Sequence, residues 1–260
     1  GKVSLFSSGG GHLVVDVFGY FEQTGSSSAG RLIGVDPGRI FDTRPGSPEP
    51  GPELKVGAGD TFSVDVTGTN GVPENGVSAV VMNITAVRAD GPGFVTVYPG
   101  DETRNETANI NLSLRTLTRP NTVIMPVADD GTINIFTSTS AFLVGDVFGY
   151  FTDETAEDTD DGLFVPVFPT RLLDSREFGP PVAANGTIDF QVTGRVGIPA
   201  TANAVVFNLA GVTGQLGFVT AYPNEIARPD TANLNVPGPD TNISNLAIVP
   251  LAEPSGRITL

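Results

Sequence analysis

The chain has 260 residues, of which 39% are hydrophobic, so it is long enough for one large domain or two of ordinary size. Its 29 acidic and 14 basic residues give a net charge of −15, which repels phosphate backbones and argues against a nucleic-acid partner. The absence of cysteine excludes disulfides, thiolate metal sites and cysteine nucleophiles, and no apolar run is long enough for membrane insertion.

Short apolar runs rich in Val, Ile, Thr and Phe alternate with turn residues along the chain, which contains 32 glycines and 21 prolines. This pattern is typical of antiparallel β-structure, and no stretch keeps a helical apolar period over several turns. After apolar runs at Val3–Leu5 and Leu13–Phe21, the pattern predicts eight strands, near Arg39–Asp42, Phe62–Val66, Ala79–Val87, Phe94–Tyr98, Ala108–Leu112, Thr122–Val127, Thr132–Phe136 and Phe142–Tyr150.

The chain contains two copies of one sequence unit. The motif "GRIFDTR" at Gly38–Arg44 returns as "TRLLDSR" at Thr170–Arg176, and "GFVTVYP" at Gly93–Pro99 returns as "GFVTAYP" at Gly217–Pro223. The spacing of roughly 125–130 residues is the size of an ordinary domain, so each copy should hold about eight strands. Further matches join residues 66–87 with 192–212, 106–112 with 230–236 and 121–135 with 245–260.

The sequence therefore predicts an all-β fold of two tandem antiparallel β-sandwich, jelly-roll-like units. The expected parts are an N-terminal strand pair at 1–21, a linker at 22–30, a complete unit at 31–151, an acidic linker at 152–162 and a unit lacking its last strand at 163–260.

The chain ends are offset from the unit ends. "HLVVDVFGYF" at His12–Phe21 matches "AFLVGDVFGYF" at Ala141–Phe151, and "GKVSL" at Gly1–Leu5 matches "GTINI" at Gly131–Ile135. We expect residues 1–21 to complete a neighbouring unit, because an uncovered strand face forgoes about 6–10 kcal/mol of apolar burial. The expected assembly interface consists of Val3, Leu5, Leu13, Val15, Val17, Phe18, Tyr20 and Phe21.

Two arrangements satisfy this expectation. In one, the natural polypeptide is a longer tandem array of which these residues are a part. In the other, the N-terminal strands of one subunit enter the unit at 163–260 of the next, as in donor-strand complementation. Such a head-to-tail contact grows a filament when it does not close. In both arrangements the partner is the protein itself.

Four motifs carry a family resemblance: R-x-x-D-[TS]-R early in each unit, "AVV.N.T.V" in the middle, "GFVT.YP" after it and "DVFGYF" at the end. Together they resemble tandem β-rich modules of large secreted and surface proteins of bacteria, and the resemblance covers nearly the whole chain. It implies an extracellular or cell-surface location and a modular, structural or adhesive role. It brings no named fold or activity.

Several carboxylates and arginines fall in apolar strands. Asp16 and Asp146 lie among Val and Phe, and the R-x-x-D-[TS]-R motifs add Arg39, Asp42, Arg44, Arg171, Asp174 and Arg176. A carboxylate pair could serve glycoside hydrolysis, whereas an arginine–aspartate network would join the terminal strands. The network is the favoured interpretation, because arginine recurs in both copies. It predicts Asp146 near Arg39 or Arg44, and Asp16 near Arg171 or Arg176 of a neighbouring chain or module.

Other candidate sites are weaker. Asp158, Asp160 and Asp161 precede Gly162, but their spacing does not match a calcium loop, so we expect an extended acidic linker and no cofactor, with calcium binding by these three residues as the alternative. His12 is the only histidine, which leaves no zinc cluster. Possible glycosylation sites are Asn105, Asn111, Asn185 and Asn242, whereas the sequon at Asn83 lies inside a predicted strand.

We therefore expect a structural repeat subunit of an extracellular filament, sheath or surface layer, assembled by strand complementation and without enzymatic activity. The alternative is a carbohydrate- or surface-binding adhesin module of a larger secreted protein, with glycans as partners. The absence of tryptophan weakens the case for a sugar-stacking platform.

Overall fold

The computed structural model describes residues 28–104, 106–114, 116–158, 162–165, 167, 170–177, 179–212, 215–238 and 243–260. The protein is all-β with antiparallel sheets, as the sequence predicts, and the described residues contain no α-helix, only a 3₁₀ turn at Ser175–Glu177. We call residues 31–151 the first copy and residues 163–260 the second copy.

The first copy contains eight strands in two sheets. They are β1 (Leu32–Asp42), β2 (Thr61–Asp65), β3 (Val77–Val87), β4 (Gly93–Pro99), β5 (Ile110–Leu112), β6 (Arg119–Pro126), β7 (Thr132–Thr137) and β8 (Phe142–Thr152). One sheet has the order β1-β8-β3-β6 and the other β2-β7-β4-β5, with antiparallel neighbours throughout. This is the strand order of an eight-stranded jelly roll.

The core of the first copy lies between these two sheets. Met82 and Ile84 of β3 belong to the same buried cluster as Val95 of β4 and Ile135 of β7, and Phe41 of β1 is fully buried with them. The apolar side chains of both sheets therefore point at one another, which is why the period-two pattern was visible in the sequence.

Each of the eight predicted strands is present in the first copy. The largest difference is at β1, which begins at Leu32 rather than at Arg39. Its pairing with β8 shifts register between Gly34 and Gly38, where the sequence reads "GVDPG". In the sequence, the glycines and the proline of this stretch indicate a turn. An irregular strand can nevertheless contain them, whereas a regular strand cannot.

The second copy has shorter strands: β9 (Asp189–Gln191), β10 (Ala204–Gly211), β11 (Gly217–Val219), β12 (Tyr222–Pro223), β13 (Leu234–Val236), β14 (Ile243–Pro250) and β15 (Arg257–Thr259). They pair as β10-β14, β11-β13 and β12-β15-β9 around a second buried cluster that includes Val192, Leu234, Val249 and Ile258. The described part of Thr170–Arg176, where the repeat predicts a counterpart of β1, forms no strand. In the first copy, β1 takes its ladder hydrogen bonds from β8, and the described residues hold no counterpart of β8 here.

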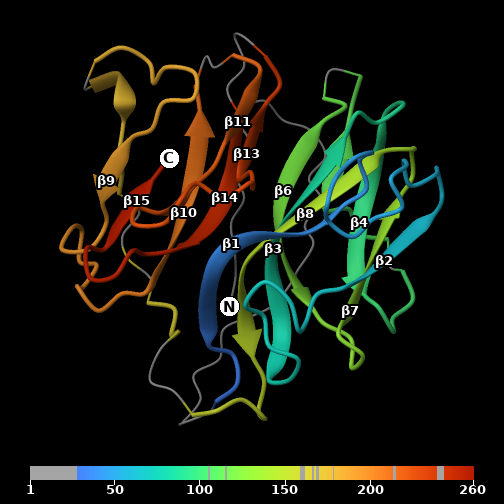
Figure 1. Ribbon diagram of the computed structural model, residues 1–260, viewed down its shortest axis with the longest axis horizontal. Coiled ribbons are helices and arrows are strands. Elements are labelled where there is room, and N and C mark those ends of the chain that lie inside the picture. The colour runs from blue at the N-terminus through green and yellow to red at the C-terminus, as the bar shows by residue number, and fades with distance from the viewer. Residues whose placement is uncertain are drawn as a thin grey trace, which may run out of the picture.

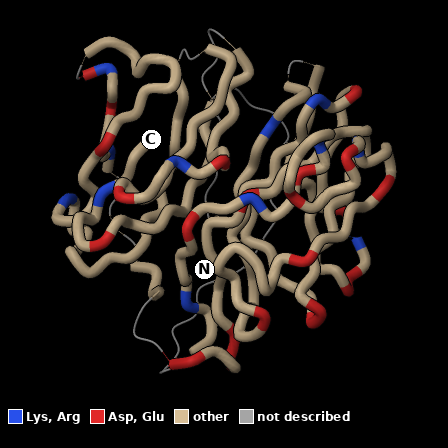
Figure 2. Tube along the Cα trace, in the orientation of Figure 1, with Lys and Arg blue, Asp and Glu red and all other residues tan. Residues whose placement is uncertain are grey.

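The two copies lie side by side, with the second on the left of Figure 1 and β14 next to the sheet that contains β1, β3 and β6. Acidic residues are scattered over the loops of both copies, as Figure 2 shows. No helix within the described part of the chain is long and apolar enough to cross a membrane.

Candidate assembly site

The centre of the site is an ion pair between β1 and β8 of the first copy. Arg39 and Asp146 are cross-strand partners, and Arg39 Nε lies 2.8 Å from Asp146 Oδ1. Arg39 Nη1 also lies 3.6 Å from Asp42 Oδ2. The Asp146 side chain is 1% exposed and that of Arg39 11% exposed, so the pair is shielded from solvent.

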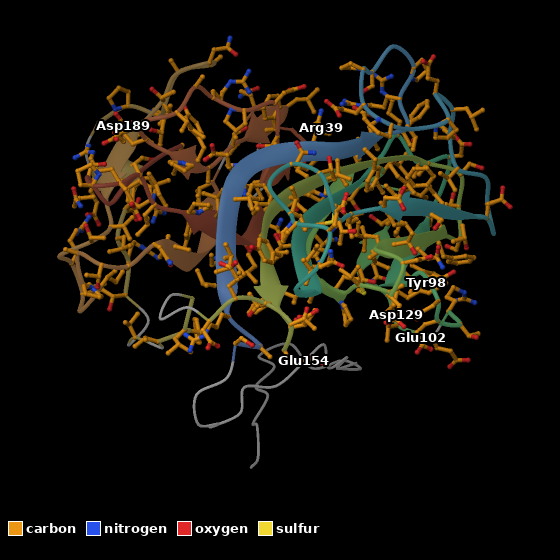
Figure 3. All side chains as sticks on the ribbon, turned by 60° about the horizontal axis from the view of Figure 1, so that its bottom comes forward. Arg39, Tyr98, Glu102, Asp129, Glu154 and Asp189 are labelled. Atoms are coloured by element: carbon orange, nitrogen blue, oxygen red, sulfur yellow. The ribbon has the colours of Figure 1, made fainter. Side chains whose placement is uncertain are left out.

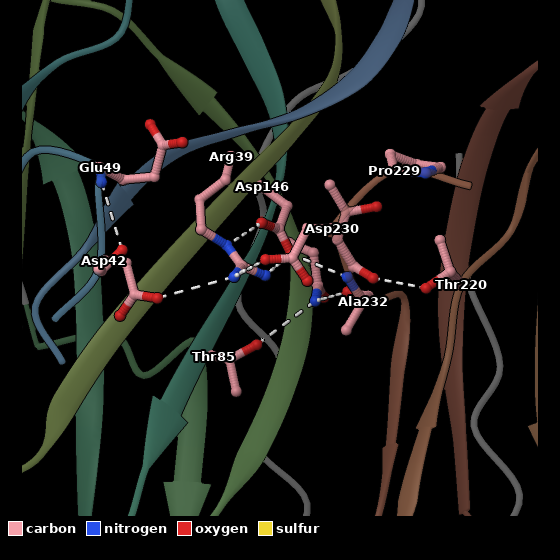
Figure 4. A network of polar contacts seen from close by, with 12 residues as sticks. Arg39, Asp42, Glu49, Thr85, Asp146, Thr220, Pro229, Asp230 and Ala232 are labelled. Carbon is pink, nitrogen blue, oxygen red and sulfur yellow. Dashed lines mark hydrogen bonds and ion pairs between the residues drawn. The ribbon is translucent and has the colours of Figure 1, made fainter. Parts of the chain in front are cut away.

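The second copy completes this network. Asp230 Oδ2 lies 3.3 Å from Arg39 Nη1, and the backbone N–H of Ala232 donates to Asp146 Oδ2 at 2.9 Å. Figure 4 shows both residues reaching across from the second copy, and Figure 3 places Arg39 on β1, away from Tyr98, Glu102 and Asp129 at the far end of the first copy. The arginine–aspartate network therefore joins two copies as well as two strands.

Burial and hydrogen bonding act in opposite directions on these carboxyls. Burial raises the pKa of Asp146 overall, although hydrogen bonds from Arg39 and Ala232 favour its ionised form. Burial also acts to raise the pKa of Asp42, but the hydrogen bonds and charge of Arg44 outweigh it and leave this pKa lowered. Two carboxylates of one network thus titrate in opposite directions from their ordinary value.

An asparagine chain runs beside the ion pairs. Asn83 of β3 donates to the carbonyl of Ala232, and Asn245 of β14 donates to Asn83 Oδ1 at 2.9 Å. Thr122 of β6 donates its backbone N–H to Asn245 Oδ1 at 3.2 Å and its hydroxyl to the carbonyl of Leu246 at 2.5 Å. Asn83 is 0% exposed and Asn245 5% exposed, so these bonds satisfy polar groups that water does not reach.

Apolar contacts support the same contact surface, which we call the junction. Leu32, Val81 and Ile248 form one buried cluster, against which Ile124 and Phe151 pack. Gly34 of β1 lies so close to Pro250 of β14 that a Cβ there would be 2.8 Å from the proline Cγ. A side chain larger than hydrogen at position 34 would therefore push the copies apart.

The edge of β10 is the second part of the site. In the first copy, β3 pairs with β6 on one side and β8 on the other, whereas its counterpart β10 pairs only with β14 among the described residues. Val206, the counterpart of Val81, is 36% exposed, while Val81 is 0% exposed. Asn208, the counterpart of Asn83, is exposed as well. We call this side of β10 the open edge.

The R-x-x-D-[TS]-R motif has the same local geometry in both copies. Arg44 Nε donates to Asp42 Oδ1 at 2.9 Å, and Arg176 Nε donates to Asp174 Oδ1 at 2.8 Å. Hydrogen bonds from Arg176 lower the pKa of Asp174. Arg171 instead differs from its counterpart Arg39: it contacts Asp174 at 3.0 Å, and its side chain is 69% exposed.

Several predicted site residues lie outside the described residues: the N-terminal interface set, Asp16, Asp160, Asp161, Asn105 and Asn242. Asp158, Asn111 and Asn185 are described and exposed. The described residues contain no cluster of His, Asp or Glu suited to a metal ion. Asn83 is buried at the junction, where a glycan has no room.

Sequence reasoning missed the asparagines and the loop at Asp230–Ala232. The signal was present, since three asparagines recur 124 or 125 residues apart at matching positions of the two copies: Asn83 with Asn208, Asn109 with Asn233, and Asn121 with Asn245. Part of this recurrence is internal to each copy. Asn109 Oδ1 accepts from the Val97 N–H, and Asn233 Oδ1 accepts from the Ala221 N–H, both at 2.7 Å.

Comparison with known protein families, curated proteins and solved structures found no match for the chain. Its function must therefore be argued from the junction and the open edge themselves.

Proposed function

We propose that this protein is a structural repeat subunit of an extracellular filament, sheath or surface layer, in which β-strand complementation closes the open edge of β10. The observation that carries the proposal is the contrast between β3 and β10. The same sequence pattern is buried in β3, which lies between β6 and β8 and packs on the second copy, and partly exposed in β10, which lacks a neighbour on one side among the described residues. An uncovered strand edge and apolar face favour addition of a further strand.

The sequence contains a segment suited to the open edge of β10. Residues 12–21 repeat the β8 sequence, so they carry the alternation that β3 accepts in the first copy. Head-to-tail joining of chains through such a strand would build a polymer, because the donated strand and the accepting edge come from different parts of the chain. The side chains at the junction support a structural role, since Arg39 of the neighbouring strand holds the buried Asp146 and Arg44, two residues further along the chain, holds the buried Asp42.

The test is removal and return of the strand. A chain lacking residues 1–21 should lose assembly, and a synthetic peptide of residues 1–21 should bind it and raise its melting temperature. A control peptide with Leu13, Val15 and Val17 changed to threonine should neither bind nor stabilise. Undiminished polymerisation of the shortened chain, or equal stabilisation by both peptides, would contradict the proposal.

A carbohydrate-binding role is the second candidate, and one cavity favours it. A cavity of about 100 Å³ lies at the junction between Arg39, Asp146 and Phe218. Thr231 Oγ1 and Asn235 Oδ1 also line this region, and both lack a hydrogen-bond partner among the described residues. Sugar hydroxyls would satisfy these atoms. Binding of the full chain on a glycan array, lost in Thr231→Val and kept in the exposed control Asn185→Ala, would support this role.

A further inference from the structure

Two pairs of equivalent residues from the two copies meet at the junction. Thr122 and Leu246 occupy equivalent positions in β6 and β14, and they bond to each other. Ile124 and Ile248 are also equivalent, and both belong to the apolar cluster of the junction. Contact between equivalent residues is typical of an isologous interface, in which a two-fold axis relates each contact to a second, equivalent contact.

Only one half of this interface is made by the described residues. The hydrogen bond between Asn83 and Asn245 would have its equivalent between Asn208 and Asn121. Asn208 is exposed instead, and Asn121 is only half-buried. The ion pair of Arg39 with Asp230 would have its equivalent between Arg171 and Glu106, and both of these are exposed. The unmade half surrounds the open edge, where the first copy has β8.

The β8 register specifies how residues 12–21 would fill that half. Asn83 pairs with Asp146 and Ala79 with Phe151 in the β3–β8 ladder. Applied to the second copy, this register sets Asp16 opposite Asn208 and Phe21 opposite Ala204. Asp16 would then lie near Arg171 and the backbone N–H of Ala108, which mirror Arg39 and Ala232.

Side-chain volumes agree with this placement. In the first copy, a Cβ at Gly145 of β8 would lie 2.1 Å from the ring of Phe41, so only glycine fits. The corresponding residues are Val15 of the N-terminal segment and Leu173 of the second copy, and Leu173 packs on the second buried cluster. Gly145 faces the large Phe41, and the larger Val15 would face the smaller Leu173. The combined side-chain volume of the two positions therefore stays similar.

The described residues that follow the N-terminal segment lie next to the residues that enter the second copy. The backbone N–H of Gly30 donates to the carbonyl of Thr152, and that of Leu32 donates to the carbonyl of Gly162, so the segments entering the two copies run together. Pro250 pairs with Ala204 and touches Gly34, which puts the expected position of Phe21 within about 15 Å of Gly34. Because residues 28–34 already have fixed positions, the free tether runs from residue 21 to residue 28 and can span up to about 25 Å.

We propose that residues 12–21 add to the open edge of β10 in the same chain, with Asp16 opposite Asn208 and Val15 against Leu173, so that the chain closes on itself. This inference rests on the proposed strand complementation and assigns the source of the strand. The closed chain is then the unassembled subunit, and the proposed polymer forms when this segment passes to a second copy of the chain, as in a domain swap.

Engineered cysteines test the source and the register together, because the 260-residue sequence contains no cysteine. The β3–β8 ladder pairs Thr85 with Val144, so the equivalent pair is Ala210 with Val14. The double variant Val14→Cys with Ala210→Cys should form a disulfide in the full chain at monomer mass, at a rate independent of protein concentration. Leu13→Cys with Ala210→Cys is the matched control, because a shift of one residue points the thiol to the opposite face, and it should cross-link at least about 10-fold more slowly.

Each outcome decides a different point. A covalent ladder of dimers and higher species would overturn closure within one chain and leave complementation between chains standing. Equal cross-linking of both pairs would overturn the register, and no cross-linking of either would overturn addition at β10 altogether. As a second measurement, Leu173→Phe should slow cross-linking of the Val14 pair about 10-fold, and adding Val15→Gly should restore it, because glycine again faces phenylalanine as in the first copy. A general folding defect would not be restored by Val15→Gly.

Discussion

The two copies of this protein have similar sequences, but the first copy has longer strands and more complete strand pairing among the described residues. In the first copy, β8 sits between β1 and β3, and all three strands are long and buried. In the second copy, the counterpart of β3 has one neighbour, and the counterpart of β1 forms no strand among the described residues. The difference lies at one strand, because β8 supplies ladder hydrogen bonds to both of its neighbours and protects the edges that they would otherwise expose.

The largest loss of stability should come from placing the larger side chain of Val15 at the equivalent position of the first copy, Gly145. Gly145→Val in the first copy would force a side chain into the ring of Phe41, which is fully buried, and should destabilise the protein by at least about 3 kcal/mol. Denaturant unfolding measures this change. The double variant with Phe41→Leu reproduces the Val15 and Leu173 combination and should recover most of the loss. If the double variant is no more stable than Gly145→Val alone, the volume argument fails.

Removing the central carboxylate should have the next largest effect. Asp146→Asn leaves Arg39 with only the more distant Asp42 and Asp230, and we expect a loss of about 2–3 kcal/mol. The pKa of Asp146 is raised, so the folded state holds its proton longer than the unfolded chain does. The wild-type advantage over the variant should therefore be largest below the ordinary pKa of 3.8 and shrink as pH rises through the raised value. An advantage that grows with pH in unfolding titrations would contradict this sign.

The junction asparagines offer a direct comparison of the copies. Asn83→Ala leaves the carbonyl of Ala232 without its side-chain donor and should cost about 1–2 kcal/mol. If residues 12–21 cover β10, then Asn208→Ala should cost a similar amount in the full chain. In a chain lacking residues 1–21 the Asn208 variant should fall within about 0.5 kcal/mol of its parent, as exposed positions do. Equal costs with and without residues 1–21 would show that no strand covers Asn208.

The sequence predicted the strands far better than it predicted the site. Strand positions follow from apolar alternation and turn residues, which are local, and the repeat located the ion-pair motif in both copies. The junction depends on how two folded copies meet, and no local pattern encodes that. Asp230 and Ala232 lie in a loop with no apolar signal, and Ala232 contributes only backbone groups, so its side-chain identity carries no information about the contact.

The smallest effect separates the two R-x-x-D-[TS]-R motifs. Asp42→Asn should cost about 1 kcal/mol near neutral pH, because Arg44 loses a buried, charged acceptor. Asp174→Asn should lower the melting temperature less, because Arg176 is 62% exposed and water replaces its partner. Both pKa values are lowered, so each contribution is present above about pH 3.8 and is lost as pH falls through the lowered value. Melting curves of both variants between pH 2 and pH 7 measure this difference, and an Asp174→Asn loss as large as that of Asp42→Asn would mean that a strand shields the second motif in the full chain.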